Sequence, residues 1–198
     1  MLQTQTMTAF FHDPAAPILP DQFEAEFSAL LDLFDQRKPR RILEIGVREG
    51  GSLYQWIKHA EPGAEIVAID LPGAMWGHHN TGNTERWLQW AADRGVNLSV
   101  YLSSSHDPEI MLKVVKEHAP FDFVFIDGDH SLEGLVSDFL AFGNQTHGII
   151  ALHDILPDIT DSRIEGWKLW RILRPLYTTD ELISDDDQTS RGIGVIYV

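Results

Sequence analysis

The chain has 198 residues, no cysteine and a formal net charge of −15 at neutral pH. This length suggests a single domain, and the absence of cysteine excludes disulfides, thiolate metal sites and cysteine nucleophiles. An acidic surface repels nucleic-acid phosphates and anionic lipids, so we expect neither as a partner. No apolar run approaches the ~18 residues of a membrane span, and no basic residue precedes the first apolar patch as in a secretory signal. We therefore expect a cytoplasmic protein.

Residues 1–39 are predicted to form an amino-terminal extension and one helix. We expect the first twenty residues to lie extended over the surface. Asp21 with Glu24 three positions later is typical of a capped first turn, so the helix is predicted to begin at Asp21. Apolar residues follow at helical spacing and predict one buried face, formed by Phe23, Phe27, Leu30, Leu31 and Phe34.

Residues 40–198 alternate between short apolar runs and helical patterns. This alternation indicates βαβ units in one α/β domain, with a doubly wound, mostly parallel sheet that is covered by helices on both faces. Strands are predicted at 41–46, 65–70, 96–102, 121–127, 148–154, 181–184 and 191–198, of which 181–184 is the weakest. Helices are predicted at 52–60, at 84–94, from Asp107 onward, over 132–140 and at 164–173.

A glycine-rich segment, EIGVREGGS, follows the first predicted strand. Ligands of such sheets bind beyond the carboxyl ends of the strands, and glycine lets the backbone approach a ligand closely. The segment is neither G-x-G-x-x-G nor a phosphate loop, and alone it is equally compatible with an ordinary turn. Asp70 ends the second strand, where a carboxylate can accept hydrogen bonds from both hydroxyls of a ribose. Together the two features indicate a nucleoside-binding site.

The segments ILEIGVREGGS and IVAID resemble the first two motifs of class I S-adenosylmethionine (SAM)-dependent methyltransferases. The later IDGDH and ALHD resemble metal-dependent small-molecule O-methyltransferases of catechol and macrocin type, and the related cephalosporin-hydroxylase-like proteins. The resemblance spans about residues 40–198 and implies a Rossmann-like sheet of seven strands whose last strand is antiparallel. It also implies methyl transfer from SAM to a hydroxyl of a small-molecule acceptor, assisted by a divalent metal such as Mg²⁺ or Mn²⁺.

The same resemblance implies which residues bind the cofactor. The glycine-rich segment would line the methionine part, Asp70 would hold the ribose, and Leu71 would flank the adenine. The serines after the third strand would touch the adenine, or they lead into the helix that Asp107 caps. The implied cofactor-binding residues are Glu44, Gly46, Gly50, Gly51, Ser52, Asp70, Leu71, Ser104, Ser105, His106 and Asp127.

Ionisable residues follow two strands that we expect to be neighbours in the sheet. The strand FDFVFID ends in Asp127, with Asp129 and His130 directly behind it, and the next strand ends in His153 and Asp154. Neighbouring strands lie about 4.8 Å apart, so groups at the two ends can converge on one ion. Asp127, His153 and Asp154 offer two carboxylates and one imidazole, which suit Mn²⁺, Fe²⁺ or Zn²⁺ as well as harder ions. The resembled subgroup has an acid where this chain has His153.

The predicted catalytic base is His130 or Asp129. In catechol-type enzymes the base is a lysine three residues after the metal ligand, at the position of His130. In sugar-type relatives an acid two residues after it has this role, at the position of Asp129. Asp129 is alternatively a cap for the helix that begins at Ser131, because acids favour helix amino termini.

Two segments are candidates for the acceptor pocket. Residues 72–83 contain three glycines beside Met75 and Trp76, and are either a lid over the cofactor or a surface loop. Residues 156–170 contain Trp167 and Trp170, which either contact the acceptor or pack a helix onto the sheet.

Two other functions are compatible with the sequence. His130 and His153 with one of the aspartates supply two imidazoles and a carboxylate, the ligands of a non-heme iron oxygenase. Alternatively the fold binds an adenosyl ligand without catalysis. A nicotinamide dehydrogenase is disfavoured by the spacing of the glycines. The oligomeric state, including a homo-oligomer, stays open.

Overall fold

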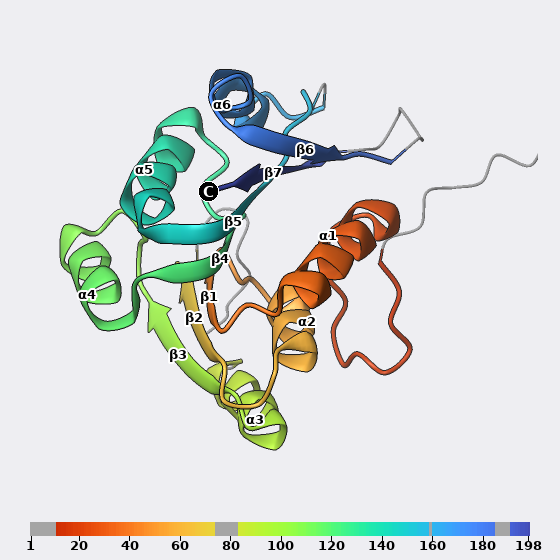
Figure 1. Cartoon of the computed structure of the whole chain (residues 1–198), viewed down its shortest axis with the longest axis vertical. Helices are drawn as coiled ribbons and strands as arrows, with labels where there is room; N and C mark the ends of the chain where they lie inside the picture. The colour runs from red at the N-terminus through yellow and green to blue at the C-terminus, as the bar shows by residue number, and fades with distance from the viewer. Residues whose placement is uncertain (1–10, 74–82, 159, 185–190) are drawn as a thin grey trace, which may run out of the picture.

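One seven-stranded sheet runs through the molecule (Figure 1). The computed structural model describes residues 11–73, 83–158, 160–184 and 191–198. In chain order the strands are β1 (Arg41–Ile45), β2 (Glu65–Asp70), β3 (Asn97–Leu102), β4 (Phe121–Ile126), β5 (Thr146–His153), β6 (Thr178–Leu182) and β7 (Ile193–Tyr197). Their order in the sheet is β3-β2-β1-β4-β5-β7-β6. β7 is antiparallel to both neighbours and the others are mutually parallel, which confirms the predicted fold.

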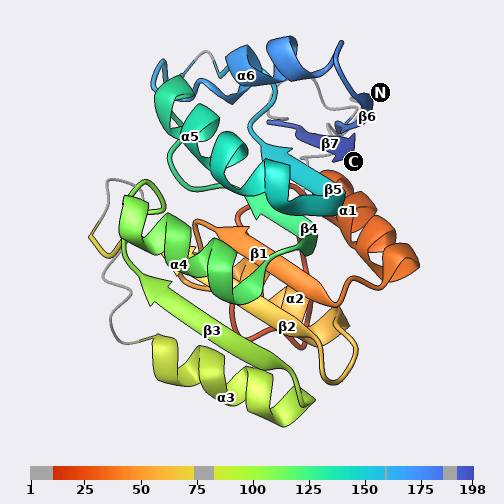
Figure 2. The ribbon, with the colours of Figure 1, turned by 60° about the vertical axis from the view of Figure 1, so that its left-hand side comes forward.

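Helices cover both faces of the sheet, as predicted (Figure 2). One face is covered by α1 (Glu24–Arg37), α2 (Gly51–His59) and α3 (Thr84–Arg94). The other is covered by α4 (Pro108–His118), α5 (Leu132–Phe142) and α6 (Gly166–Leu173), and the short 3-10 helix η2 (Gly143–Gln145) leads into β5. None of the helices in the described part of the chain has the length and apolar character that crossing a bilayer requires.

Strand β4 is buried on both faces, because it lies between β1 and β5 at the centre of the sheet. Successive side chains of a strand point to opposite faces. Phe123 and Phe125 therefore pack in the core under α1 and α2, while Val124 and Ile126 pack in the core under α5. This double burial explains the continuous apolar run and holds the end of β4 firmly in the sheet.

Helix α1 begins three residues later than predicted. Its first residue is Glu24, and its amino-terminal cap is Phe23, which makes no side-chain capping bond. Asp21, the predicted cap, instead forms an ion pair with Arg48 of the glycine-rich segment. The capping role predicted for Asp21 is therefore not observed. Helix α4 behaves as predicted, since the Asp107 carboxylate accepts a hydrogen bond from the backbone N–H of Glu109.

Residues 11–20 contain no helix or strand, but they are fastened to α2. The buried carboxylate of Asp13 accepts hydrogen bonds from Gln55 Nε2 at 3.0 Å and from Lys58 Nζ at 2.6 Å. Phe11 packs against Phe27 of α1 with ring centroids 5.2 Å apart. The segment thus has a fixed course over the helices.

Strand β6 lies earlier in the chain than predicted, at 178–182 rather than at 181–184. It is an edge strand beside β7, and its residues are exposed or half-buried. A strand without a buried face lacks the apolar alternation from which its bounds can be predicted.

Trp56 of α2 joins α1 to the sheet. It is completely buried, and its ring lies 5.2 Å from that of Phe34 and 5.1 Å from that of Phe123. We expect Trp56→Ala to lower the free energy of unfolding by about 3–5 kcal/mol, because it leaves a large cavity between helix and sheet. Leu112→Ala on the exposed face of α4 should change it by less than about 0.5 kcal/mol. Urea denaturation of both variants measures the two values, and similar values would contradict this role of Trp56.

Candidate functional site

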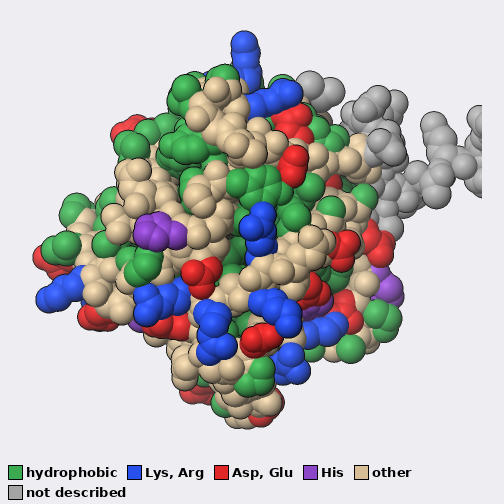
Figure 3. Space-filling view, in the orientation of Figure 1, with side chains coloured by type: hydrophobic (Ala, Val, Ile, Leu, Met, Phe, Trp, Pro, Cys, Tyr) green, Lys and Arg blue, Asp and Glu red, His purple; other side chains and the backbone are tan. Residues whose placement is uncertain are grey.

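A cavity of about 460 Å³ lies beyond the carboxyl ends of the parallel strands. Its wall is formed by the segments that follow β1, β2, β3, β4 and β5, together with residues 19–22 from the amino-terminal segment. The sheet order reverses between β1 and β4, and this is where such sheets bind ligands. On the face in Figure 3, Lys and Arg side chains lie among Asp and Glu side chains, so neither sign forms one continuous patch there.

The glycine-rich segment turns sharply beside the end of β4. Gly46 has φ +87°, and a Cβ atom on it would lie 2.2 Å from the backbone oxygen of Asp127. Only glycine fits this conformation and this contact. The Asp70 Oδ1 atom accepts hydrogen bonds from the backbone N–H groups of Val47 at 2.9 Å and Arg48 at 3.0 Å. Asp70 therefore holds the segment in place while it lines the cavity.

Nine of the eleven predicted cofactor-binding residues line the cavity. Glu44 and Gly50 do not, since Glu44 is buried beneath the glycine-rich segment and Gly50 faces the ring of Trp87. The nine residues are Gly46, Gly51, Ser52, Asp70, Leu71, Ser104, Ser105, His106 and Asp127.

Glu44 supports the cavity wall from behind. Its side chain is completely buried and accepts a hydrogen bond from the hydroxyl of Ser52, which itself lines the cavity. Burial, helped by the nearby Asp127 and Asp70 carboxylates, outweighs the hydrogen bonds that lower the pKa of Glu44, and the net effect raises it to about 8. Glu44 is therefore mainly a neutral acid at pH 7.

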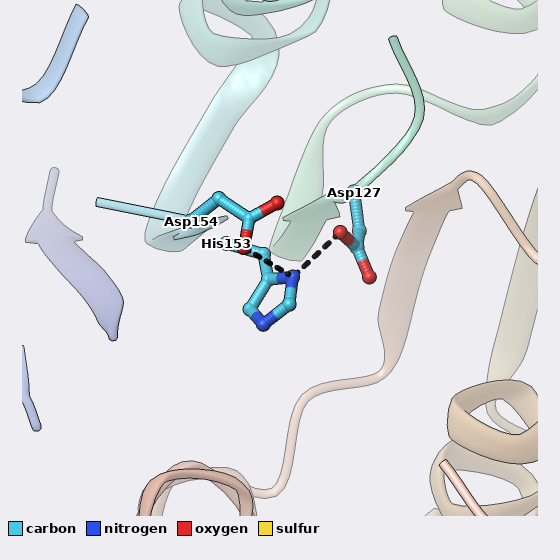
Figure 4. A group of neighbouring side chains, drawn as sticks. All are labelled: Asp127, His153 and Asp154. Atoms are coloured by element: carbon cyan, nitrogen blue, oxygen red, sulfur yellow. Dashed lines mark hydrogen bonds and ion pairs between the residues drawn. The ribbon is translucent and has the colours of Figure 1, made fainter. Parts of the chain in front are cut away.

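The ends of β4 and β5 bring three ionisable side chains together (Figure 4). His153 Nδ1 lies 2.8 Å from Asp127 Oδ1 and 3.6 Å from Asp154 Oδ1. Burial lowers the pKa of His153, but the two carboxylates outweigh burial and raise it to about 9. Asp154 has φ +59°, an uncommon conformation for a residue with a side chain, and such strain is frequent at functional sites.

The three side chains fit a divalent ion. One possible ligand atom from each of Asp127, His153 and Asp154 lies within 4.8 Å of the others, and no other such group exists in the described part of the chain. The Nε2 atom of His153 is buried without a hydrogen-bond partner among the described residues. Two carboxylates and an imidazole suit Mn²⁺, Fe²⁺ or Zn²⁺ better than they suit Mg²⁺.

His130 and Asp129 differ in their contacts. His130 lines the cavity, and its Nδ1 forms an ion pair with Asp154 Oδ2 at 2.7 Å. Burial lowers the pKa of His130, but Asp154 and Asp127 raise it above its ordinary value. The exposed Asp129 accepts a hydrogen bond from the backbone N–H of Ser131 at 2.9 Å. This bond matches the alternative in which Asp129 stabilises the start of α5.

His106 contacts a residue that the sequence analysis missed. Its Nε2 lies 3.4 Å from Oδ1 of Asp138, a completely buried acid in α5. Asp138 raises the pKa of His106. The sequence around Asp138 does not reveal this contact, because an aspartate on a helix is usually exposed.

Residues 19–22 of the cavity wall were also missed by the sequence analysis. Gln22 Nε2 donates a hydrogen bond to Asp127 Oδ2 at 2.7 Å, across 105 positions of sequence. The backbone of Leu19 packs so closely on Gly51 that a Cβ atom there would lie 2.3 Å from the Leu19 oxygen. No motif marks these residues, since their position comes from the packing of the extension on α2.

The two predicted acceptor segments have different outcomes. Residues 74–82, most of the predicted lid, lie outside the described residues. Trp170 packs in the core with 3% of its surface exposed, and Trp167 is half-buried. Neither tryptophan lines the cavity, which favours the structural alternative. Ile164 and Arg191 line it instead.

We expect stability to fall as the pH rises from about 5 to 9. The folded protein holds protons on Glu44 up to about pH 8 and on His153 up to about pH 9, whereas the unfolded chain releases them near 4.5 and 6.5. Glu44→Gln replaces the acid with a neutral group of the same size. It should stabilise the protein at pH 8 by on the order of 1–2 kcal/mol relative to wild type, with little change at pH 5. Urea denaturation of both proteins across this pH range measures the free energy of unfolding. If wild type and Glu44→Gln show parallel pH profiles, the expectation is wrong.

Residues 43–155 match the model of a protein family described as a methyltransferase domain. A comparison with curated protein sequences finds no match. Among solved structures, the chain is 19% identical to the O-methyltransferase TomG from Streptomyces achromogenes, involved in tomaymycin synthesis and solved with SAM. That match has a TM-score of 0.66 and covers 86% of this chain and 78% of TomG.

Two further structures have the same fold. An O-methyltransferase from Bacillus cereus, solved with S-adenosylhomocysteine (SAH), is 19% identical with a TM-score of 0.66, covering 93% of this chain and 84% of its own. MycE from the mycinamycin biosynthetic pathway, solved with Mg, SAH and mycinamycin VI, is 16% identical with a TM-score of 0.58, covering 85% of this chain and 48% of its own. Because the family model spans more than half of the sequence, the chain belongs to this methyltransferase family.

Proposed function

We propose that the protein transfers a methyl group from SAM to a hydroxyl oxygen of a small-molecule acceptor. The observation that carries this proposal is the cavity itself, whose wall includes Gly46, Asp70 and His130, and His130 is paired with Asp154. The proposed nucleoside-binding site and the proposed proton acceptor thus lie in the same cavity. The similar structures solved with SAM or SAH are O-methyltransferases, and their likeness supports the same cofactor.

The cavity wall supplies partners for each part of the cofactor. Asp70 is suited to the ribose hydroxyls, because its carboxylate is already oriented by the glycine-rich segment. Leu71 and the backbone and hydroxyls of Ser104 and Ser105 are suited to the adenine ring. Ser52 and Gly51 at the start of α2 are suited to the methionine part, whose carboxylate a helix amino terminus favours.

His130 is the stronger candidate for the base. Its Nδ1 is held by Asp154, so Nε2 is the ring nitrogen that takes the proton of the acceptor hydroxyl as the oxygen–methyl bond forms. Against the effect of burial, Asp154 and Asp127 raise the pKa of His130, so the neutral imidazole is a stronger proton acceptor than a free histidine. Asp129 is exposed and bound to the backbone at the start of α5, so it is less suited to this role. The walls align the reacting atoms, and such alignment lowers a barrier by roughly 7–11 kcal/mol.

A divalent metal has a defined place in this proposal. Asp127, His153 and Asp154 would hold it, and Oδ2 of Asp154 would still orient His130. When bound, such an ion lowers the pKa of a coordinated hydroxyl. MycE, solved with Mg, supports metal assistance in this fold.

The iron oxygenase is less favoured by the geometry. Its site requires two imidazoles, whereas the ion-binding group among the described residues contains only His153. His130 is turned to the carboxylate of Asp154. A protein that binds the adenosyl ligand without catalysis would bind SAH but methylate no acceptor.

We expect the protein to bind SAH, and Asp70→Asn to weaken binding about 10- to 100-fold. Asparagine keeps an oxygen for the glycine-rich segment but loses the charge that strengthens bonds to the ribose. Isothermal titration calorimetry measures the affinities. Asp93 is an exposed aspartate at the end of α3, and the control variant Asp93→Asn should bind SAH as tightly as wild type does. Absence of wild-type binding at high micromolar SAH would refute the proposed function.

With SAM and a panel of phenols and sugars, methylated product should form and be detected by mass spectrometry. His130→Gln should lower kcat by about 10²–10⁴-fold with little change in SAH affinity, because glutamine keeps an N–H donor for Asp154 but has no basic nitrogen. Asp129→Asn should keep most of the activity, since Asp129 contacts the backbone at the start of α5. If Asp129→Asn inactivates the enzyme and His130→Gln does not, Asp129 is the base.

A further inference from the structure

Gln22 has an unusual environment at the wall of the cavity. Only 3% of its surface is exposed, although it follows a segment that has no helix or strand. Its backbone oxygen accepts a hydrogen bond from the N–H of Phe11 at 3.1 Å, and its Nε2 donates to Asp127 Oδ2 at 2.7 Å. Both ends of the residue are therefore fixed, and so is the orientation of its amide.

The second polar atom of the amide has no partner. Gln22 Oε1 is buried and accepts no hydrogen bond from any described residue. The carboxylate of Asp127 requires a donor, so Nε2 must face it and Oε1 must face away from it. Buried polar atoms are nearly always satisfied. Because Gln22 lines the cavity, a ligand that fills the cavity can supply the missing donor to Oε1.

The position of Gln22 indicates which part of the ligand this is. Asp70 ends β2 and Asp127 follows β4, on opposite sides of β1. A cofactor whose ribose lies on Asp70 extends across the end of β1 toward Asp127 and Gln22. The end of SAM that is remote from the ribose carries an ammonium and a carboxylate group. The negative charge of Asp127 attracts the ammonium and repels the carboxylate.

We propose that Gln22 Oε1 accepts a hydrogen bond from the ammonium group of the cofactor, so that Gln22 is a positioning residue for its methionine part. This inference rests on the proposed function. The same amide then joins the ammonium to Asp127, and it fixes the methionine chain relative to His130. The amino-terminal segment thereby supplies a cofactor contact that the family motifs do not contain.

Two ligands separate this role from a general effect on the site. SAH carries the ammonium group, whereas 5′-methylthioadenosine has the same nucleoside and thioether without the amino acid part. Gln22→Met keeps the length of the side chain but removes both polar atoms. It should weaken SAH binding about 10- to 100-fold and change methylthioadenosine binding by less than about twofold. Calorimetry in buffer with a chelator excludes a contribution from metal at Asp127.

The ratio of the two affinities is measured on the same variant, so a general loss of folding affects both values alike. Gln22→Asn, in which the amide is retracted from Asp127, provides a second ratio and should also lower the preference for SAH. Gln89→Leu, on the exposed side of α3, is the matched control and should leave the ratio unchanged. If Gln22→Met leaves the ratio of the two affinities unchanged, because it weakens neither ligand or both equally, the inference is overturned. No binding of either ligand to wild type would instead refute the proposed function.

Discussion

The close contact between the ends of β1 and β4 is the constraint on which the site depends. Asp127 donates its backbone N–H to the Ile45 oxygen at 2.9 Å, and Gly46 donates to the Ile69 oxygen at 2.9 Å. These bonds continue the sheet one residue beyond its strands, and the missing side chain of Gly46 makes room for them. The glycine-rich segment must then turn away, which opens the cavity directly beside Asp127. A larger residue at 46 would push apart the two segments that carry the proposed nucleoside-binding residue Asp70 and the proposed base His130.

The charges at the ends of β4 and β5 are stable because acids and imidazoles alternate. Asp127 pairs with His153, and Asp154 pairs with His130, so each buried charge has a partner. Removing one partner would leave an uncompensated charge in a poorly solvated place. A metal ion and the proton on Nδ1 of His153 would occupy the same position between the carboxylates. Metal binding there must therefore release that proton, and its affinity must decrease as the pH falls.

The sequence predicts the features that repeat or that belong to a local pattern. Buried strands such as β4 are visible as apolar runs, and Asp107 followed by proline marks the start of α4. Nine of the residues predicted to bind the cofactor line the cavity, because they lie in segments that directly follow strands. The predicted cap of α1 was wrong, since Asp21 pairs with Arg48 and does not cap the helix. Gln22 and Asp138 were missed for the same reason, since their roles come from contacts between distant segments that no local pattern encodes.

The position of Gln22 depends on an anchor at the other end of its segment. Burial opposes ionisation of Asp13, but hydrogen bonds from Lys58 and Gln55 outweigh it and lower the pKa of Asp13 to about 2. The ionised carboxylate holds residues 11–20 on α2, and α2 begins within the glycine-rich segment. The same helix thus contributes Gly51 and Ser52 to the cavity wall and holds the amino-terminal segment, whose residues 19–22 form another part of that wall. The amino-terminal extension is therefore part of the site, although the sequence pattern of the methyltransferase domain begins only after it.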